Sequence, residues 1–213
     1  MVNGQHHPFL LRRDQLLLRC PLPPYPDALI NLICRDHHAG DEASDVHEAM
    51  GILARSIRPQ HYVDRTDVDD AQSPVPSRRT ALMWAAIRGQ IELGRILVQA
   101  GASLDLQDVD GKTVLMLLAS HASYARRDAE IAFVQELVKA GASLDLRDLG
   151  GKTAIMLAAR SIEHGGLMVA TLAKAGASLD VKDGDGETAL IAAARLGVTE
   201  NVQELVSTEE ERN

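Results

Sequence analysis

Three stretches of the chain carry residue types that could perform chemistry, and the most suggestive is Gly151-Lys152-Thr153. Gly-Lys-Thr closes the phosphate-binding loop of nucleotide-binding proteins, in which an earlier glycine, five residues before this one, lets the backbone wrap around a phosphate. Leu146 stands at that earlier position, and Leu106 stands there for the similar stretch Gly111-Lys112-Thr113. We therefore interpret both stretches as turns and not as phosphate loops.

The second stretch is a scatter of metal-ligand residue types near the amino terminus. Cys34, His37 and His38 follow Cys20, but no Cys-x-x-Cys pair is present. Structural zinc sites use such paired spacing, so a buried thiol and two solvent-facing histidines are favoured over a metal site.

The third stretch is His47-Glu48, which resembles the start of a zinc-protease helix. Gly51 replaces the second histidine that such a helix needs four residues later. We expect no catalytic residue, no metal and no cofactor. The competing class is an enzyme or metal protein based on residues 1–77, and metal analysis of the purified protein would test it.

The composition limits the classes of protein and of core. Hydrophobic residues make up 46% of the 213 residues but aromatic residues only 3%, so the core is expected to consist of aliphatic side chains and methionine between closely spaced helices. The net charge of −8 argues against binding nucleic acid through the whole surface. Two cysteines, the absence of a signal peptide and the absence of a membrane span predict a cytoplasmic protein that binds no membrane. We also expect the protein to be monomeric on its own.

An internal repeat decides the expected fold. Ala-Gly-Ala-Ser-Leu-Asp occurs at 100–105, 140–145 and 175–180. A threonine followed by an apolar run occurs at 80, 113, 153 and 188, with spacings of 33, 40 and 35 residues. A period in this range is typical of a solenoid in which each repeat is one supersecondary unit.

Each unit has a turn, two helices and a glycine at a helix end. Asp and Gly occupy the first and fourth positions of predicted type I turns at 108–111, 148–151 and 183–186. The threonine that follows is expected to cap the first helix. Helical spacing places Leu82, Ala85 and Ala86 on one buried stripe, and Leu190, Ala193 and Ala194 on the equivalent stripe of the last copy. Gly101, Gly141 and Gly176 are expected to end the second helices in a left-handed conformation.

The amino-terminal part is less regular. A short helix is expected within residues 9–19, followed by a degenerate repeat over 27–57 and an irregular loop over 58–77. Val63-Asp64 resembles the Leu104-Asp105 end of the recurring motif. We therefore divide the chain into a capping segment at 1–77, regular repeats at 78–206 and an acidic polar tail at 207–213.

The repeats from residue 78 to 206 resemble the ankyrin repeat, in their Asp-x-x-Gly-x-Thr turn, Leu-x-x-Ala helix and closing Gly-Ala. The resemblance implies an all-α solenoid of helix-turn-helix pairs joined by β-hairpin fingers, with four clear repeats and a degenerate one before them. The chain departs from the family pattern at Met83, Met116, Met156 and Ile191, where histidine is usual. We expect the methionines to line the core or groove between repeats.

The family resemblance also implies a function, which is protein binding through a concave surface made of fingers and first helices. A dedicated cytoplasmic inhibitor of a toxin or enzyme is the alternative. We expect partner contacts at Arg79, Trp84, Ile87, Arg88, Gln107, Val109, Asp110, Lys112, His121, Arg147, Leu149, Lys152, Arg160, Lys182, Asp185, Glu187 and Arg195.

The charge of these expected contacts indicates the chemistry of the partner. Eight are basic and three acidic, a formal balance of +5 that the turn aspartates at 108, 148 and 183 lower to +2. We hypothesise an acidic or mixed-charge protein partner, with Gln107, Arg147 and Lys182 as the variable positions beyond each motif. The simpler alternative is that these cations only solvate an exposed face.

Overall fold

The repeats fold into pairs of helices that stack side by side. The computed structural model describes residues 64, 66, 77–121, 127–162 and 165–212. The first helices of the four described repeats are α5 (Ala81–Arg88), α7 (Val114–His121), α9 (Ala154–Ala159) and α11 (Ala189–Leu196). The second helices are α6 (Ile91–Gln99), α8 (Arg127–Lys139), α10 (Gly165–Lys174) and α12 (Thr199–Arg212).

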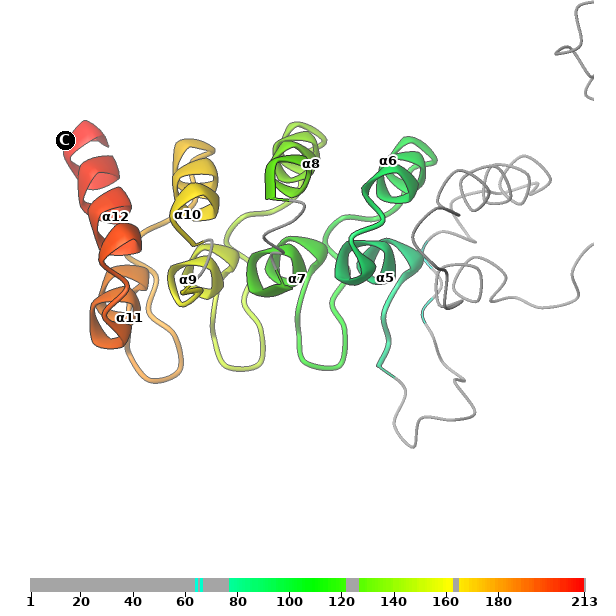
Figure 1. The fold of residues 1–213 in the computed structure, drawn as a ribbon. Helices are drawn as coiled ribbons and strands as arrows, with labels where there is room; N and C mark the ends of the chain where they lie inside the picture. The colour runs from blue at the N-terminus through cyan, green and yellow to red at the C-terminus, as the bar shows by residue number, and fades with distance from the viewer. Residues whose placement is uncertain (1–63, 65, 67–76, 122–126, 163–164, 213) are drawn as a thin grey trace, which may run out of the picture.

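The helices form two layers. Figure 1 shows the first helices in one layer, the second helices in the other, and the fingers projecting beyond the first-helix layer. Within the first layer α5 packs on α7, α7 on α9 and α9 on α11, while α6, α8, α10 and α12 pack in succession in the second layer. The predicted all-α solenoid is therefore confirmed. The expected helix at 9–19, the degenerate repeat at 27–57 and most of the loop at 58–77 lie outside the described residues.

Each finger is closed by the predicted turn. The N–H of Gly111 donates to the carbonyl of Asp108 at 3.0 Å, and the glycines at 151 and 186 make the same bond to the aspartates at 148 and 183. Threonine then caps the first helix, as where the N–H of Met83 donates to the hydroxyl oxygen of Thr80 at 3.3 Å. The turn prediction is confirmed, and so is the cap at Thr80, Thr113 and Thr188, whereas the hydroxyl oxygen of Thr153 makes no hydrogen bond to a described residue. Beyond the turns, the described residues add one isolated antiparallel bridge, between Thr66 and Thr80.

The methionines at the third position of the first helices belong to the core between repeats. Met83, Met116 and Met156 are at most 2% exposed. The sulfurs of Met83 and Met156 also lie 3.5 Å from the backbone nitrogens of Thr80 and Thr153, within reach of a weak hydrogen bond. Methionine thus fills the core and supplies a weak acceptor for the cap, and the prediction of an inter-repeat core position is confirmed.

The predicted stripe of leucine and alanine side chains is buried in the first described repeat but partly exposed in the last. Leu82, Ala85 and Ala86 are all buried, which confirms the prediction for α5. In α11 only Ala193 of the predicted stripe is buried, whereas Leu190 is half-buried and Ala194 is exposed. The prediction was wrong there because the stripe packs against the first helix of the following repeat, and none of the described residues covers α11 on that side.

The second helices end where the recurring motif begins. Gly101, Gly141 and Gly176 have φ values of 86°, 96° and 100°, so the predicted left-handed helix ends are confirmed. The last second helix is longer than the others. α12 continues through Ser207 to Arg212, so most of the stretch expected as a polar tail is helical.

A ladder of hydrogen bonds joins the recurring motifs of successive repeats. Asp105, which ends one motif, accepts hydrogen bonds from the N–H of Ser143 at 2.8 Å and from its hydroxyl. Both bonds also join Ser103 to Asp64, and the backbone bond joins Ser178 to Asp145. Asp64 therefore takes the position of the motif's aspartate, as its likeness to Asp105 predicted. The first two copies of the motif each donate to the aspartate before them and accept from the copy after them, which accounts for the repeated Ser and Asp.

We predict that Gly151→Ala destabilises the array more than Gly186→Ala. Both glycines have positive φ, 75° and 80°, so both variants carry the strain of a left-handed alanine, about 1–2 kcal/mol. Only at Gly151 would the new Cβ also meet another repeat, since it would lie 2.9 Å from the backbone nitrogen of Gly184, whereas nothing lies within 4 Å at Gly186. Urea unfolding measures both losses, and equal losses would show that finger-to-finger packing does not limit residue 151.

Candidate partner-binding surface

The expected binding residues all lie on the fingers or on the first helices. Figure 1 shows these elements on the same side of the array, away from α6, α8, α10 and α12. We use the name finger face for the exposed and half-buried residues within 77–88, 106–121, 146–161 and 181–196. The geometry of this face separates residues that hold the array together from residues whose side chains are left to contact a partner.

An aspartate organises each finger, and it is buried in two of the three. One carboxylate oxygen of Asp183 accepts hydrogen bonds from the backbone N–H groups of Asp185 and Glu187, at 3.0 and 2.9 Å. The aspartates at 108 and 148 bind the corresponding two N–H groups of their own turns. The side chains of Asp108 and Asp183 are 0% and 2% exposed. A carboxylate buried to this extent needs a further partner for its second oxygen.

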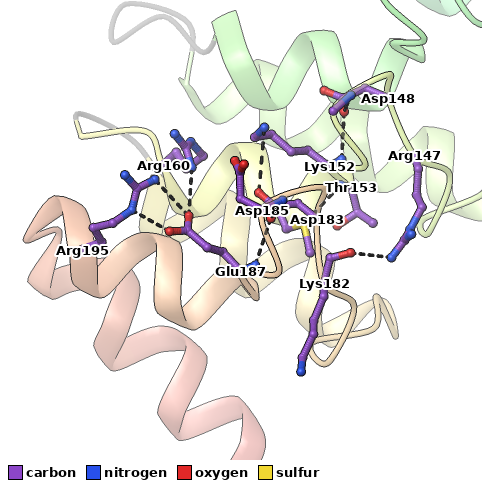
Figure 2. Close-up of polar contacts among 12 residues, drawn as sticks. Arg147, Asp148, Lys152, Thr153, Arg160, Lys182, Asp183, Asp185, Glu187 and Arg195 are labelled. Atoms are coloured by element: carbon purple, nitrogen blue, oxygen red, sulfur yellow. Dashed lines mark hydrogen bonds and ion pairs between the residues drawn. The ribbon is translucent and has the colours of Figure 1, made fainter.

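Cations of the preceding repeat supply that partner. The guanidinium of Arg79 lies 3.3 Å from the second oxygen of Asp108, and the ammonium of Lys152 lies 3.8 Å from that of Asp183. Figure 2 shows the Lys152 contact. Burial disfavours the charged form of Asp183, but the two backbone N–H groups, Lys152 and Arg160 together outweigh burial and lower the pKa of its carboxyl. Two of the cations expected to meet a partner thus bridge one repeat to the next.

The last repeat has the opposite charge at this position. Glu187 occupies the place of Arg79 and Lys152, directly before the helix-capping threonine. Its carboxylate lies 2.8 Å from Nε of Arg195 and 3.6 Å from a terminal nitrogen of Arg160. Figure 2 shows the two guanidinium groups approaching Glu187 from different elements, α11 and the end of α9. Four of the eight expected cations are therefore ion-paired within the array.

The positions two residues beyond the motif were expected to carry function, but two of them also bind the next finger. The side-chain amide of Gln107 donates to the carbonyl of Arg147 at 2.8 Å, and the guanidinium of Arg147 donates to the carbonyl of Lys182 at 2.6 Å. Lys182 has no such following finger among the described residues, and it is exposed. The side chains at this position therefore join each finger to the next one, except in the last copy.

The apolar residues among the expected contacts lie at the tips of the fingers and on α5. Leu149 is 81% exposed and Val109, at the same position of the preceding finger, is 37% exposed. The two tips are adjacent, because the N–H of Leu149 donates to the carbonyl of Asp110 at 2.9 Å. Trp84 and Ile87 are half-buried, and the guanidinium of Arg79 lies 5.2 Å from the centre of the Trp84 ring.

The remaining expected residues lie at helix ends and finger tips. Arg88 and His121 are the last residues of α5 and α7. Asp110 and Asp185 are exposed at the tips, and Lys112 is half-buried beside its own finger. No ion pair of Lys112, Asp110 or Asp185 with another described residue is present.

Sequence reasoning missed the pairing of face cations with buried turn aspartates. The available indication was the column of residues before the capping threonines, which reads Arg79, Lys112, Lys152 and Glu187. The sign changes in the last copy, after which the described residues contain no further finger aspartate.

Among the described residues, no three His, Cys, Asp or Glu side chains gather into a metal site. Cys20, Cys34, His37, His38 and His47-Glu48 lie outside the described residues. None of the described helices is long and apolar enough to cross a membrane.

We predict that Asp183→Asn lowers the free energy of unfolding at pH 7 by about 2 kcal/mol, because charge-assisted hydrogen bonds become neutral ones. The pKa of Asp183 is lower in the folded state than the value of about 3.9 of an unfolded aspartate. Its contribution is therefore complete above about pH 4 and disappears as pH falls through the folded value. Urea unfolding between pH 7 and pH 3 measures this. The difference between wild type and variant should shrink below pH 4, and a constant difference would contradict the prediction. Asp185→Asn, at an exposed tip, is the control.

Comparison with known families matches the architecture just described. The family described as ankyrin repeats (3 copies) matches residues 51–128 and 120–213, which together cover well over half of the chain. No curated protein matches the sequence. The turn aspartates, capping threonines, paired helices and projecting fingers account for the match in physical terms, and the chain belongs to the ankyrin repeat family.

Proposed function

We propose that this protein is a non-catalytic module that binds a partner protein through the finger face. Ankyrin repeats are generally protein-protein interaction modules and generally not catalysts. The proposal adds which surface is used and which residues contribute.

The exposed row of apolar finger tips carries the proposal. Leu149 has most of its side chain in water, and Val109 lies on the adjacent finger. Neither side chain at this exposure contributes much to the core, and both sit on turns fixed by the bonds of Asp108 and Asp148. Rigid apolar groups of this kind favour association, because burying them gains hydrophobic free energy while little conformational entropy is lost.

The charges that the array does not use indicate a mixed-charge partner. Arg79, Lys152, Arg160 and Arg195 are occupied by internal carboxylates. Lys112 and Lys182, which make no ion pair with a described residue, remain on the same face as the exposed carboxylates of Asp110 and Asp185. A surface with both signs, close to balance, is complementary to a partner that carries both signs and favours correct orientation more than raw affinity.

The proposal also covers the type of partner, the oligomeric state and the location in the cell. An immunity-type inhibitor would use the same surface, and its partner would be a toxin or enzyme that loses activity on binding. A monomeric, cytoplasmic protein remains our expectation, which sedimentation of the purified chain and localisation of a tagged chain would test.

We predict that a finger variant combining Lys112→Glu, Leu149→Asp and Lys182→Glu loses its protein partner. These side chains are exposed or half-buried and make no described ion pair, so the variant should fold. Lys152 and Arg160 are avoided because their reversal would break contacts within the array. Wild type and variant are used in parallel to capture proteins from native lysate, with identification by mass spectrometry and titration calorimetry on the purified partner. We expect at least a tenfold loss of affinity.

The matched control is a second variant with Lys139→Glu and Lys174→Glu, at exposed ends of the outer helices α8 and α10. It changes the net charge by nearly the same amount on the opposite layer, and it should keep the partner. Retention of the partner by the finger variant, or equal loss by both variants, would show that the finger face is not the binding surface.

A further inference from the structure

The Arg160, Glu187 and Arg195 cluster at the last repeat holds more positive charge than its one carboxylate can balance. Arg195 makes two contacts to Glu187, from Nε at 2.8 Å and from a terminal nitrogen at 2.9 Å. Arg160 approaches the same carboxylate at 3.6 Å, and its nitrogen at that contact makes no hydrogen bond. Two guanidinium groups thus share the Glu187 carboxylate, and these three side chains have a formal charge of +1, which the neighbouring Lys152–Asp183 ion pair does not change.

Counting donors and acceptors shows the same excess. A guanidinium has five N–H donors and a carboxylate about four lone-pair sites, so about ten donors face about four acceptor sites. The guanidinium of Arg195 is also accessible, since its side chain is 53% exposed, whereas Glu187 is 18% exposed and lies behind it. The accessible unused donors are therefore mainly those of Arg195, where a second carboxylate has access, whereas the unbonded terminal nitrogen of Arg160 is buried behind them.

The opposite arrangement occurs in the outer layer and provides a comparison. Arg95 on α6 is a single cation between two carboxylates, those of Glu92 and Glu136. That cluster has a formal charge of −1 and an excess of acceptors. The two clusters contain the same residue types, so they differ in the sign of the ligand that they suit.

Apolar side chains flank the inner cluster. Ile191 lies one helical turn before Arg195 on α11, and residues four apart share a helix face. Ile191 is 48% exposed, and Leu196, directly after Arg195, is 42% exposed. In the inner repeats the position of Ile191 holds the buried methionines Met116 and Met156. The last repeat therefore presents a guanidinium pair beside apolar surface.

We propose that Arg160 and Arg195 bind one carboxylate of the partner protein, an aspartate or glutamate with an apolar neighbour, in competition with the internal carboxylate of Glu187. This inference rests on the proposed function and names one chemical feature of the partner. A bidentate contact between guanidinium and carboxylate has the required geometry. Asp185 at the neighbouring finger tip is an exposed carboxylate without an ion pair among the described residues, and its charge opposes the same ligand.

The test is an NMR titration of the isotope-labelled full chain with the capped peptide acetyl-Leu-Glu-Leu-amide. The neutral peptide acetyl-Leu-Gln-Leu-amide is the control for apolar contact alone. We expect the acidic peptide to shift the side-chain Nε–H signals of Arg160 and Arg195, to leave Arg95 unchanged, and to bind at least twofold more tightly than the neutral peptide.

Variants separate a binding role from a structural one. Arg195→Ala should weaken binding of the acidic peptide about two- to fivefold, the range of an exposed ion pair. Glu187→Gln should strengthen it by a similar factor, because both guanidinium groups lose their internal competitor. Asp185→Asn removes the same charge without freeing a guanidinium donor, so its gain should be smaller. Arg95→Ala on the outer layer should change nothing.

Several results would overturn the inference. The first is equal affinity for both peptides, and the second is weaker binding of the acidic peptide by folded Glu187→Gln. The third is an equal gain in affinity from Glu187→Gln and Asp185→Asn, which would indicate only a general effect of net charge. If Glu187→Gln fails to fold, unchanged affinity in Arg195→Ala is decisive against the inference. The capture experiment with the finger variant is independent of this titration. A partner lost by the finger variant, together with no selectivity for the acidic peptide, would reject this inference and leave the proposed function standing.

Discussion

The array depends on the aspartate at the first position of each finger turn, which is buried in two fingers and half-buried in the third. One carboxylate oxygen binds two N–H groups of its own turn, as in Asp183, and the other meets a cation of the preceding repeat in two of the three fingers. Removing a carboxylate from water is unfavourable unless its oxygens are satisfied, so the shape of the turn and the stacking of repeats are coupled through one side chain. The lowered pKa of Asp183 follows from this arrangement, because protonation would weaken both at once.

Contacts between neighbouring fingers extend this coupling along the chain, one repeat at a time. Carbonyl and N–H groups pair from tip to tip, as between Gly150 and Gly184 at 2.8 Å, and the Asp-Ser bonds join the motifs behind them. A structure held only by nearest neighbours must end in groups that have no following neighbour. Ile191 and Ala194 are exposed for this reason, and the reversal of charge at Glu187 suits a repeat with no following finger among the described residues.

Much of the fold was predictable from the sequence because its determinants are local. The turn at Asp108 to Gly111, the cap at Thr80 and the left-handed Gly101 each depend on a few consecutive residues, and repetition makes the pattern unambiguous. The use of Arg79 and Lys152 was not predictable from a count of face charges, since the atoms that meet depend on the offset between neighbouring fingers. Ala194 was mispredicted because aligning the copies treats them as equivalent, although the last copy has a different neighbour.

The same contacts decide where binding specificity can vary. Arg147 cannot change freely without loss to the array, because its guanidinium holds the backbone of the next finger at Lys182. Leu149 can, because its backbone holds the finger while its side chain touches little. Because the fingers are fixed, their tips lie at set distances from one another. Partner binding therefore costs little conformational entropy in the fingers, and a few apolar contacts suffice. The array therefore uses half of the expected face cations in internal ion pairs. The remaining charged side chains and the finger tips stand at defined positions, which makes partner binding through them more selective.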